Sequence, residues 1–163
     1  MALADFLQTI EQSAFGTAIR EGALYFPVLE SLHVIALVSV VGSIVAVDLR
    51  LLGLASREQP VTRVTNDFLP WTWGAFIVAA ITGLMLFSST PIRYFDSTLL
   101  RIKFFFMFLA GVNMLVFHFV TYKDVQRWDT SDVIPSSAKL AGGLSLLLWT
   151  LVIFFGRWVG FTL

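Results

Sequence analysis

The chain has 163 residues, of which 57% are hydrophobic and only 13% are charged. An ordinary soluble domain has roughly a quarter of its residues charged, so this chain has too few charges to cover a soluble surface. Basic and acidic residues number 11 each, which gives a net charge of zero and no electrostatic attraction for nucleic acid. The absence of Cys excludes disulfides, thiolate metal ligands and thiol nucleophiles.

The first twenty residues have the pattern of a short amphipathic helix. Apolar residues that include Leu3, Phe6 and Ile10 recur at helical spacing, and Asp5 and Glu11 lie on the other side. We expect this segment, residues 1–20, to lie in the membrane interface, or equally to pack against the end of a helix bundle. Acidic rather than basic residues open the segment, so we expect no cleaved leader.

Four apolar stretches follow, and each is close to the roughly 20 residues needed to cross a bilayer. We expect membrane spans at about 24–52, 68–90, 101–122 and 138–160. The connectors 56–65, 88–97 and 123–137 are polar, contain Pro and are too short to hold another domain. Because short connectors favour an antiparallel order, the sequence predicts one all-α domain, residues 1–163, built as an integral membrane up-down four-helix bundle.

Residues at the ends of these stretches agree with a membrane location. Aromatic rings with a polar group favour the headgroup layer, and they occur here at Tyr25, Trp71, Trp73, Tyr122 and Trp158. Six basic residues lie on the side of the first and third connectors and five lie on the other side. The positive-inside rule therefore favours both termini on the periplasmic side.

Small and polar residues inside the spans predict contacts between helices. Ser43, Gly83 and Gly142 each belong to a stripe of small residues that would let two helix backbones approach closely. Thr82 and Asn113 are polar residues in mid-span, and we expect each to hydrogen-bond to a neighbouring helix.

Both histidines of the chain lie inside predicted spans. His33 shares a helix face with Glu30, and His118 shares one with Gly111 and Met114. A histidine that faces a bundle interior can ligate haem iron, bind copper beside a Met, relay protons or hydrogen-bond to another helix. The residues alone leave all four alternatives open.

Haem b is the leading cofactor hypothesis, because it needs no Cys and four-helix bundles are familiar hosts for it. His33 and His118 would ligate the iron, and Gly111 would leave room for the macrocycle. In an up-down bundle, however, the two histidines differ in depth by roughly 16 Å. The two histidines can ligate one iron only if the helices begin and end at other residues than predicted. Otherwise each histidine belongs to a separate site, which a second copy of the chain or another subunit completes. Copper bound by Met114 and His118 is the weaker alternative.

Three more ionisable residues lie in or beside the first span. Glu30 and Asp48 share the face of His33, and Arg50 follows Asp48 by two residues. They either tune the site on that face or lie at the membrane boundary, where charges reach water. The sequence contains no Ser–His–acid arrangement, Gly-rich phosphate loop or HExxH motif, so hydrolytic and nucleotide-driven chemistry has no support.

Several blocks are similar to a known family: IREGALYFPVLESLHVIALVSVVGSIVAVDLRLLGL, LPWTWGAF, TGLMLF, LAGVNMLVFH, AKLAGGLSLLLW and GRW. Over nearly its whole length the chain resembles a family of small bacterial inner-membrane proteins classed as a domain of unknown function. The resemblance implies a four-helix bacterial membrane protein and no particular activity. A looser similarity in size and helix count to b-type cytochromes and copper-resistance membrane proteins is analogy, which does not transfer function.

Two functional hypotheses follow. The first is a haem b-binding membrane electron-transfer protein or redox subunit that exchanges electrons with a quinone or a periplasmic partner. The second is a non-redox membrane subunit that pairs with a partner protein or lines an ion or proton path. In either case we expect the chain to act in the lipid bilayer as a homo- or hetero-oligomer. The sequence does not decide whether a reaction is catalysed.

Overall fold

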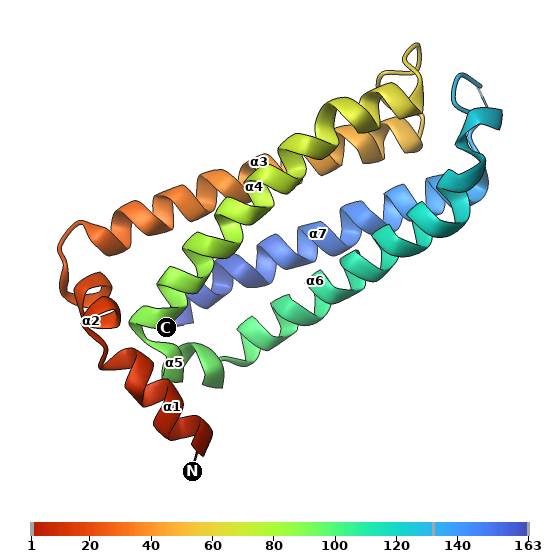
Figure 1. Ribbon diagram of the computed structural model, residues 1–163. Helices are drawn as coiled ribbons and strands as arrows, with labels where there is room; N and C mark the ends of the chain where they lie inside the picture. Colours follow the sequence, from red (N-terminus) through yellow and green to blue (C-terminus); the bar gives the residue numbers. More distant parts are fainter. Residues whose placement is uncertain (1, 132, 163) are drawn as a thin grey trace.

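Four long helices form the body of the molecule in the computed structural model, which describes residues 2–131 and 133–162 (Figure 1). They are α3 (Tyr25–Leu51), α4 (Val61–Ser89), α6 (Thr98–Val116) and α7 (Ser136–Thr162). A π-helical turn, η1 (Phe117–Thr121), and a 3-10 segment, η2 (Tyr122–Arg127), continue α6. The part of the chain that is described contains helix and no strand, which confirms the predicted all-α class.

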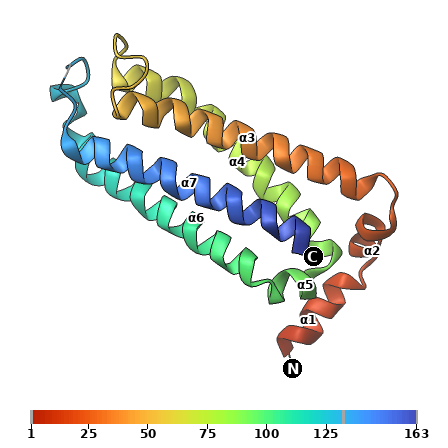
Figure 2. The same cartoon turned by 180° about the vertical axis from the view of Figure 1, so that it is seen from behind.

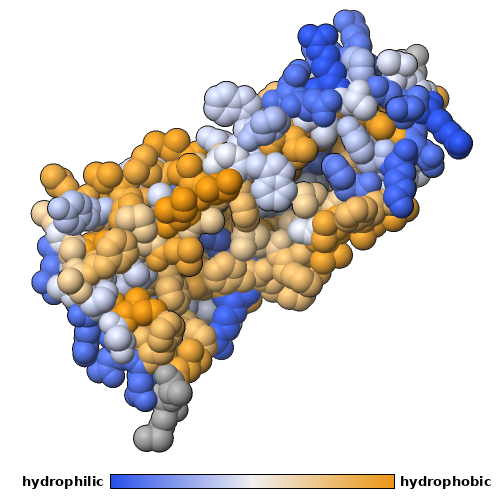
Figure 3. Space-filling view, in the orientation of Figure 1, coloured by the Kyte–Doolittle hydropathy of each residue, from blue (hydrophilic) through white to orange (hydrophobic). Residues whose placement is uncertain are grey.

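The four long helices are long and apolar enough to cross a bilayer, with α6, η1 and η2 counted together as Thr98–Arg127. Large apolar side chains cover much of their outer surface, as expected where lipid rather than water surrounds a bundle. Hydrophobic residues dominate the middle of the molecule, and hydrophilic residues gather toward its two ends (Figure 3). These features support a multi-pass membrane protein.

The long helices are arranged as two antiparallel hairpins. α3 packs along α4, and α6 packs along α7, while α3 and α7 join the two hairpins (Figures 1 and 2). Successive long helices run in opposite directions, so the predicted up-down bundle is confirmed. In the α3–α4 hairpin the hydroxyls of Ser43 and Thr72 lie 2.8 Å apart, which places small polar residues at the predicted contact.

One end of the bundle, which we call the N-terminal end, carries α1 (Ala2–Glu11), α2 (Ala14–Glu21) and α5 (Pro91–Asp96). A Cβ atom on Gly16 would lie 2.7 Å from the Ser88 carbonyl oxygen, so α2 meets the end of α4 closely. Arg20 secures this contact by donating to the Ser89 carbonyl at 3.0 Å. The N-terminal segment thus packs on the bundle's end, and it forms two short helices rather than the single one expected.

The opposite end, which we call the connector end, carries the loop 52–60 and the described residues of the second connector, 122–131 and 133–135. A buried apolar cluster holds these connectors together, and its members are Leu51, Val61, Val125, Trp128, Ile134 and Ala138. The connectors are therefore packed structure rather than loose loops.

Hydrogen bonds at the connector end explain why α4 begins at residue 61, earlier than the expected 68. The Asp129 carboxylate accepts from the Thr62 backbone N–H at 2.8 Å and from the Thr62 hydroxyl at 2.7 Å. A carboxylate in this position caps the first turn, and its negative charge is attracted to the positive N-terminal end of the helix dipole. These hydrogen bonds stabilise the polar first turns of α4 as helix, although they precede the apolar stretch that begins at residue 68.

Candidate functional site

His33 lies on the side of α3 that faces α4. Its Nδ1 atom is 3.0 Å from the Thr82 hydroxyl oxygen. A Cβ atom on Gly83 would lie only 3.0 Å from His33 Cε1, so a glycine at this position leaves the room that the imidazole occupies. The prediction that Thr82 hydrogen-bonds to another helix is confirmed, and its partner is one of the two candidate histidines.

The hydrogen bonds around Thr82 indicate which nitrogen of His33 carries the proton. The Thr82 hydroxyl has acceptors in its own helix, the Val78 carbonyl at 2.7 Å and the Ala79 carbonyl at 3.2 Å. A hydroxyl that donates its single hydrogen to a backbone carbonyl can only accept from His33. We therefore expect Nδ1 to be the donor and Nε2 of a neutral His33 to keep its lone pair.

Lys103, on the first turns of α6, also points into the bundle. Its side chain runs past Gly156 of α7, where an added Cβ would lie 3.3 Å from both Cδ and Cε of the lysine. Its charge acts on His33, so α3, α4 and α6 contribute His33, Thr82 and Lys103 to this part of the bundle interior, and α7 contributes Gly156. No ion pair in the described residues involves Lys103.

Lys103 lies inside the predicted span 101–122, but the sequence pattern predicts no role for it. The signal that identifies it is its helix face. Lys103 lies seven residues before Ala110, which is buried, and residues seven apart lie on one face of a helix. Asn113 is on the same side and donates to the Ala141 carbonyl of α7 at 3.0 Å, as predicted for that residue.

Glu30 and Tyr94 lie toward the N-terminal end from this region. Burial raises the pKa of the Tyr94 hydroxyl, and the negative charge of Glu30 raises it further. The Tyr94 ring packs against Phe87 with the ring centres 5.9 Å apart. Glu30 itself is exposed, which agrees with a residue at the membrane boundary.

The second histidine is placed differently. His118 lies in the π-helical turn η1, is exposed, and stacks on Tyr122 with ring centres 5.0 Å apart. Met114 is exposed as well, and an added Cβ on Gly111 would meet nothing within 4 Å. The structure thus brings His118, Met114 and Gly111 to the outer surface of the bundle and His33 to its interior.

Asp48 and Arg50 lie near the connector end, and both are buried, with 5% and 2% of their surfaces exposed. Arg50 donates through Nε to the Gln59 carbonyl at 2.8 Å and through Nη2 to the Asp129 carbonyl at 3.3 Å. Asp48 faces Ser145 of α7, and its Oδ2 atom has no hydrogen-bond partner among the described residues. Arg50 therefore holds the connectors, whereas Asp48 is left without a cation.

The sequence matches a family described as "Family of unknown function (DUF6644)" over residues 6–162. The chain belongs to this family. No curated protein and no solved structure matches it.

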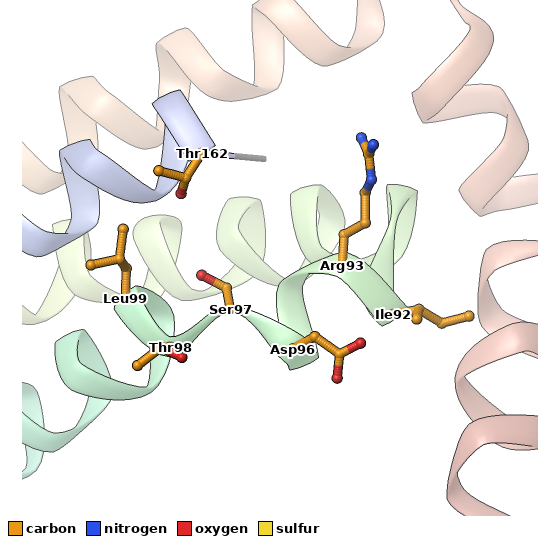
Figure 4. Close-up of a pocket in the computed structure, with 7 residues that line it drawn as sticks. All are labelled: Ile92, Arg93, Asp96, Ser97, Thr98, Leu99 and Thr162. Atoms are coloured by element: carbon orange, nitrogen blue, oxygen red, sulfur yellow. The ribbon is translucent and has the colours of Figure 1, made fainter.

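The two pockets described in this DUF6644 chain do not contain either histidine. The larger has a volume of about 460 Å³ and lies at the corner between α5 and α6. Figure 4 shows Thr162, at the end of α7, across the opening from the residues of that corner. The smaller, of about 270 Å³, lies at the connector end, where Arg50, Arg57 and Lys139 contribute to its lining.

Among the residues that the structure describes in this DUF6644 chain, no group of three or more His, Cys, Asp or Glu side chains is arranged to hold a metal ion. What the arrangement does provide is ionisable side chains turned inward in two places. His33 and Lys103 lie nearer the N-terminal end, and Asp48 lies nearer the connector end.

Proposed function

We propose that this protein is a non-redox membrane subunit whose bundle interior gives protons or small ions a route across the bilayer. His33 and Lys103 are the ionisable groups of one region of the route, and Asp48 is that of the other. The observation that carries the proposal is the inward direction of all three side chains. Ionisable residues within membrane helices are costly, and those that face the interior commonly mark ion or proton pathways.

The side chains between the two regions favour controlled passage over an open pore. Between His33 and Asp48 the same face of α3 carries Leu37, Val40 and Ile44, and Val40 is only 1% exposed. An apolar layer of this kind stops water and ions until the helices move. The α3–α7 contact joins the two hairpins, so we expect movement there to open or close the interior.

The test is proton flux into vesicles that contain the purified protein and a trapped pH-sensitive dye. Wild-type protein is expected to collapse an imposed pH gradient faster than empty vesicles do. His33→Gln, which cannot titrate, is expected to slow the collapse, whereas the matched variant His118→Gln is expected to keep the wild-type rate because its imidazole lies outside. Equal rates for wild-type and empty vesicles would contradict the proposal.

Haem b-dependent electron transfer, with a quinone or a periplasmic protein as partner, is the second candidate. The observation in its favour is the 3.0 Å contact of His33 Nδ1 with the Thr82 hydroxyl, since a ligating histidine usually donates its other ring N–H to a neighbouring oxygen. The inward His33 and the outward His118 do not suit a single iron within one chain. His33 would be one ligand, and haem held there would supply one-electron chemistry.

An absorption spectrum separates the two candidates. Protein purified from haem-replete cells shows a Soret band, and sharp α and β bands after reduction, if the second candidate is correct. Loss of these bands in His33→Ala, but not in His118→Ala, would identify His33 as the ligand. Copper would instead need Met114 and His118 on the outer surface to be completed by another chain.

We further propose that the membrane is the bacterial inner membrane and that both termini face the periplasm. The support is the excess of one basic residue on the connector side, together with the resemblance described above. The exposed His118 and Met114 fit an assembly in which this surface of α6 and η1 meets a second copy or another subunit.

A further inference from the structure

Two buried oxygen atoms near the connector end lack hydrogen-bond partners among the described residues. They are Oδ2 of Asp48 and Oγ1 of Thr65. The two residues are 5% and 6% exposed, so water outside the bundle does not satisfy these atoms. An unpartnered buried polar group is costly, so each of these two atoms calls for a group that satisfies it.

The pairing of α3 with α4 places these two oxygens at the same level of the bundle. Two contacts fix the antiparallel register of these helices: His33 meets Thr82, and Ser43 meets Thr72. A step of ten residues toward the C-terminus of α3 therefore corresponds to a step of ten residues toward the N-terminus of α4. The same register puts Asp48 opposite Asp67. Thr65 is two residues from that position, about 3 Å along the helix axis.

Helix α7 closes the other side of this region. Gly142 lets α7 approach α3 so closely that an added Cβ would lie 3.1 Å from the Asp48 carbonyl oxygen. One turn further on, Ser145 faces the Asp48 carboxyl. Tyr122, from η2, comes near Thr65 without giving Oγ1 a partner of hydrogen-bonding geometry. The Ser145 and Tyr122 hydroxyls thus add polar oxygen atoms to this region, which lies beside the buried apolar cluster that includes Leu51 and Val61.

The Asp48 carboxylate has no cation to balance it. The ion pairs in the described residues join Arg20 to Glu21 and Arg63 to Asp67. Arg50 is close in sequence, but its guanidinium donates to the carbonyls of Gln59 and Asp129. A buried carboxylate without a partner binds a proton or a cation, because its isolated charge is too costly in a medium of low dielectric.

We propose that Asp48, Thr65 and Ser145 form a binding site for a small monovalent cation of the size of sodium. Hard cations take oxygen ligands, and one carboxylate balances one positive charge. The role of this site depends on the proposed ion route, and sodium is the ion that we expect to use the Asp48 region of that route. The residues of the site do not include His33 or Lys103.

The test is calorimetric titration of the purified protein in detergent with sodium chloride, at constant ionic strength set by choline chloride. Wild-type protein is expected to give a saturable heat, with one ion bound per chain. Sodium is also expected to raise the unfolding temperature by about 3–8 °C relative to choline. Asp48→Asn is expected to lose the heat, and Thr65→Val is expected to bind at least about tenfold more weakly, the equivalent of one or two lost ligand contacts.

The matched control is Asp67→Asn, because Asp67 lies at the same level of the bundle but is exposed and paired with Arg63. This variant is expected to bind sodium as the wild type does. If Asp48→Asn fails to fold, Thr65→Val and Ser145→Ala carry the test. No saturable heat in the wild type, or undiminished heat in a folded Asp48→Asn protein, would overturn the site.

A proton in place of the cation is a distinct negative result. In that case the unfolding temperature of the wild type depends on pH and not on sodium, and Asp48→Asn removes the pH dependence. Proton flux that persists without sodium binding would refute this site and leave the proposed function standing. Sodium binding without any proton or sodium flux would support this site and refute the proposed function.

Discussion

At the scale of single residues, His33 carries most of the functional argument, and its protonated nitrogen is directly measurable. In wild-type protein labelled with ¹⁵N-histidine, the nitrogen shifts are expected to show His33 protonated at Nδ1 and bare at Nε2, because the Thr82 hydroxyl already donates to Val78. Thr82→Val removes that acceptor and is expected to mix the two tautomers at a cost of about 1 kcal/mol. Thr82→Ser serves as the control, and an Nε2-protonated wild type would refute the assignment.

Arg50 is the residue whose stabilising contribution is clearest. Arg50→Met leaves the Gln59 carbonyl without its donor and removes one of the two donors to the Asp129 carbonyl, which keeps the Val61 backbone N–H. We therefore expect a loss of about 2–3 kcal/mol in the free energy of unfolding. Unfolding by SDS from nonionic micelles, followed by circular dichroism, measures it. Arg63→Met removes only an exposed ion pair to Asp67 and should cost less than about 0.5 kcal/mol. Equal losses in the two variants would show that Arg50 does not hold the connectors.

Some side-chain contacts could be predicted from the sequence, and others depend on the tertiary structure. Thr82 and Asn113 could be predicted to bond across helices, because a polar group in mid-span needs a partner whatever the packing. The direction of His118 could not be predicted, since the π-helical turn η1 alters the rotation of the residues that follow Val116. Arg50 and Asp129 are 79 residues apart, and their hydrogen bond depends on how the two connectors meet.

At the scale of secondary-structure elements, the α3–α7 contact joins the two hairpins, and a pair of adjacent glycines tests it. Gly142→Ala places a Cβ 3.1 Å from the Asp48 carbonyl and 3.2 Å from Leu51 Cβ, so we expect a loss of about 1–2 kcal/mol. Gly143→Ala meets nothing closer than 3.9 Å and should be neutral or stabilising by up to about 1 kcal/mol, because Ala favours helix. Unfolding in SDS distinguishes them, and the opposite order would contradict the packing.

The elements that could be predicted are those whose pattern is local. Four apolar runs of membrane length needed no knowledge of tertiary contacts, and all four are helices. The polar start of α4 and the two helices of the N-terminal segment were not predicted in detail. The first depends on Asp129, and the second depends on the contacts of Gly16 and Arg20 with the end of α4.

At the scale of the whole molecule, the bundle has two ends that should lie on opposite sides of a membrane. The chain has no Cys, so single cysteines report accessibility without background. With a membrane-impermeant maleimide on intact cells, Gln8→Cys is expected to react, whereas Glu58→Cys and Gln126→Cys are expected to react only after lysis. Reaction of all three from one side would contradict the four crossings, and a reversed pattern would refute the proposed orientation alone.

The central claim is that ionisable side chains inside the bundle, and not those outside it, move protons or ions across the membrane. The most direct measurement is the rate at which protein-containing vesicles lose an imposed pH gradient. The claim predicts that His33→Gln and Lys103→Met slow the wild-type rate toward that of empty vesicles, while His118→Gln and the exposed Arg101→Met leave it unchanged. A wild-type rate equal to that of empty vesicles, or equal slowing by inward and outward variants, would contradict it.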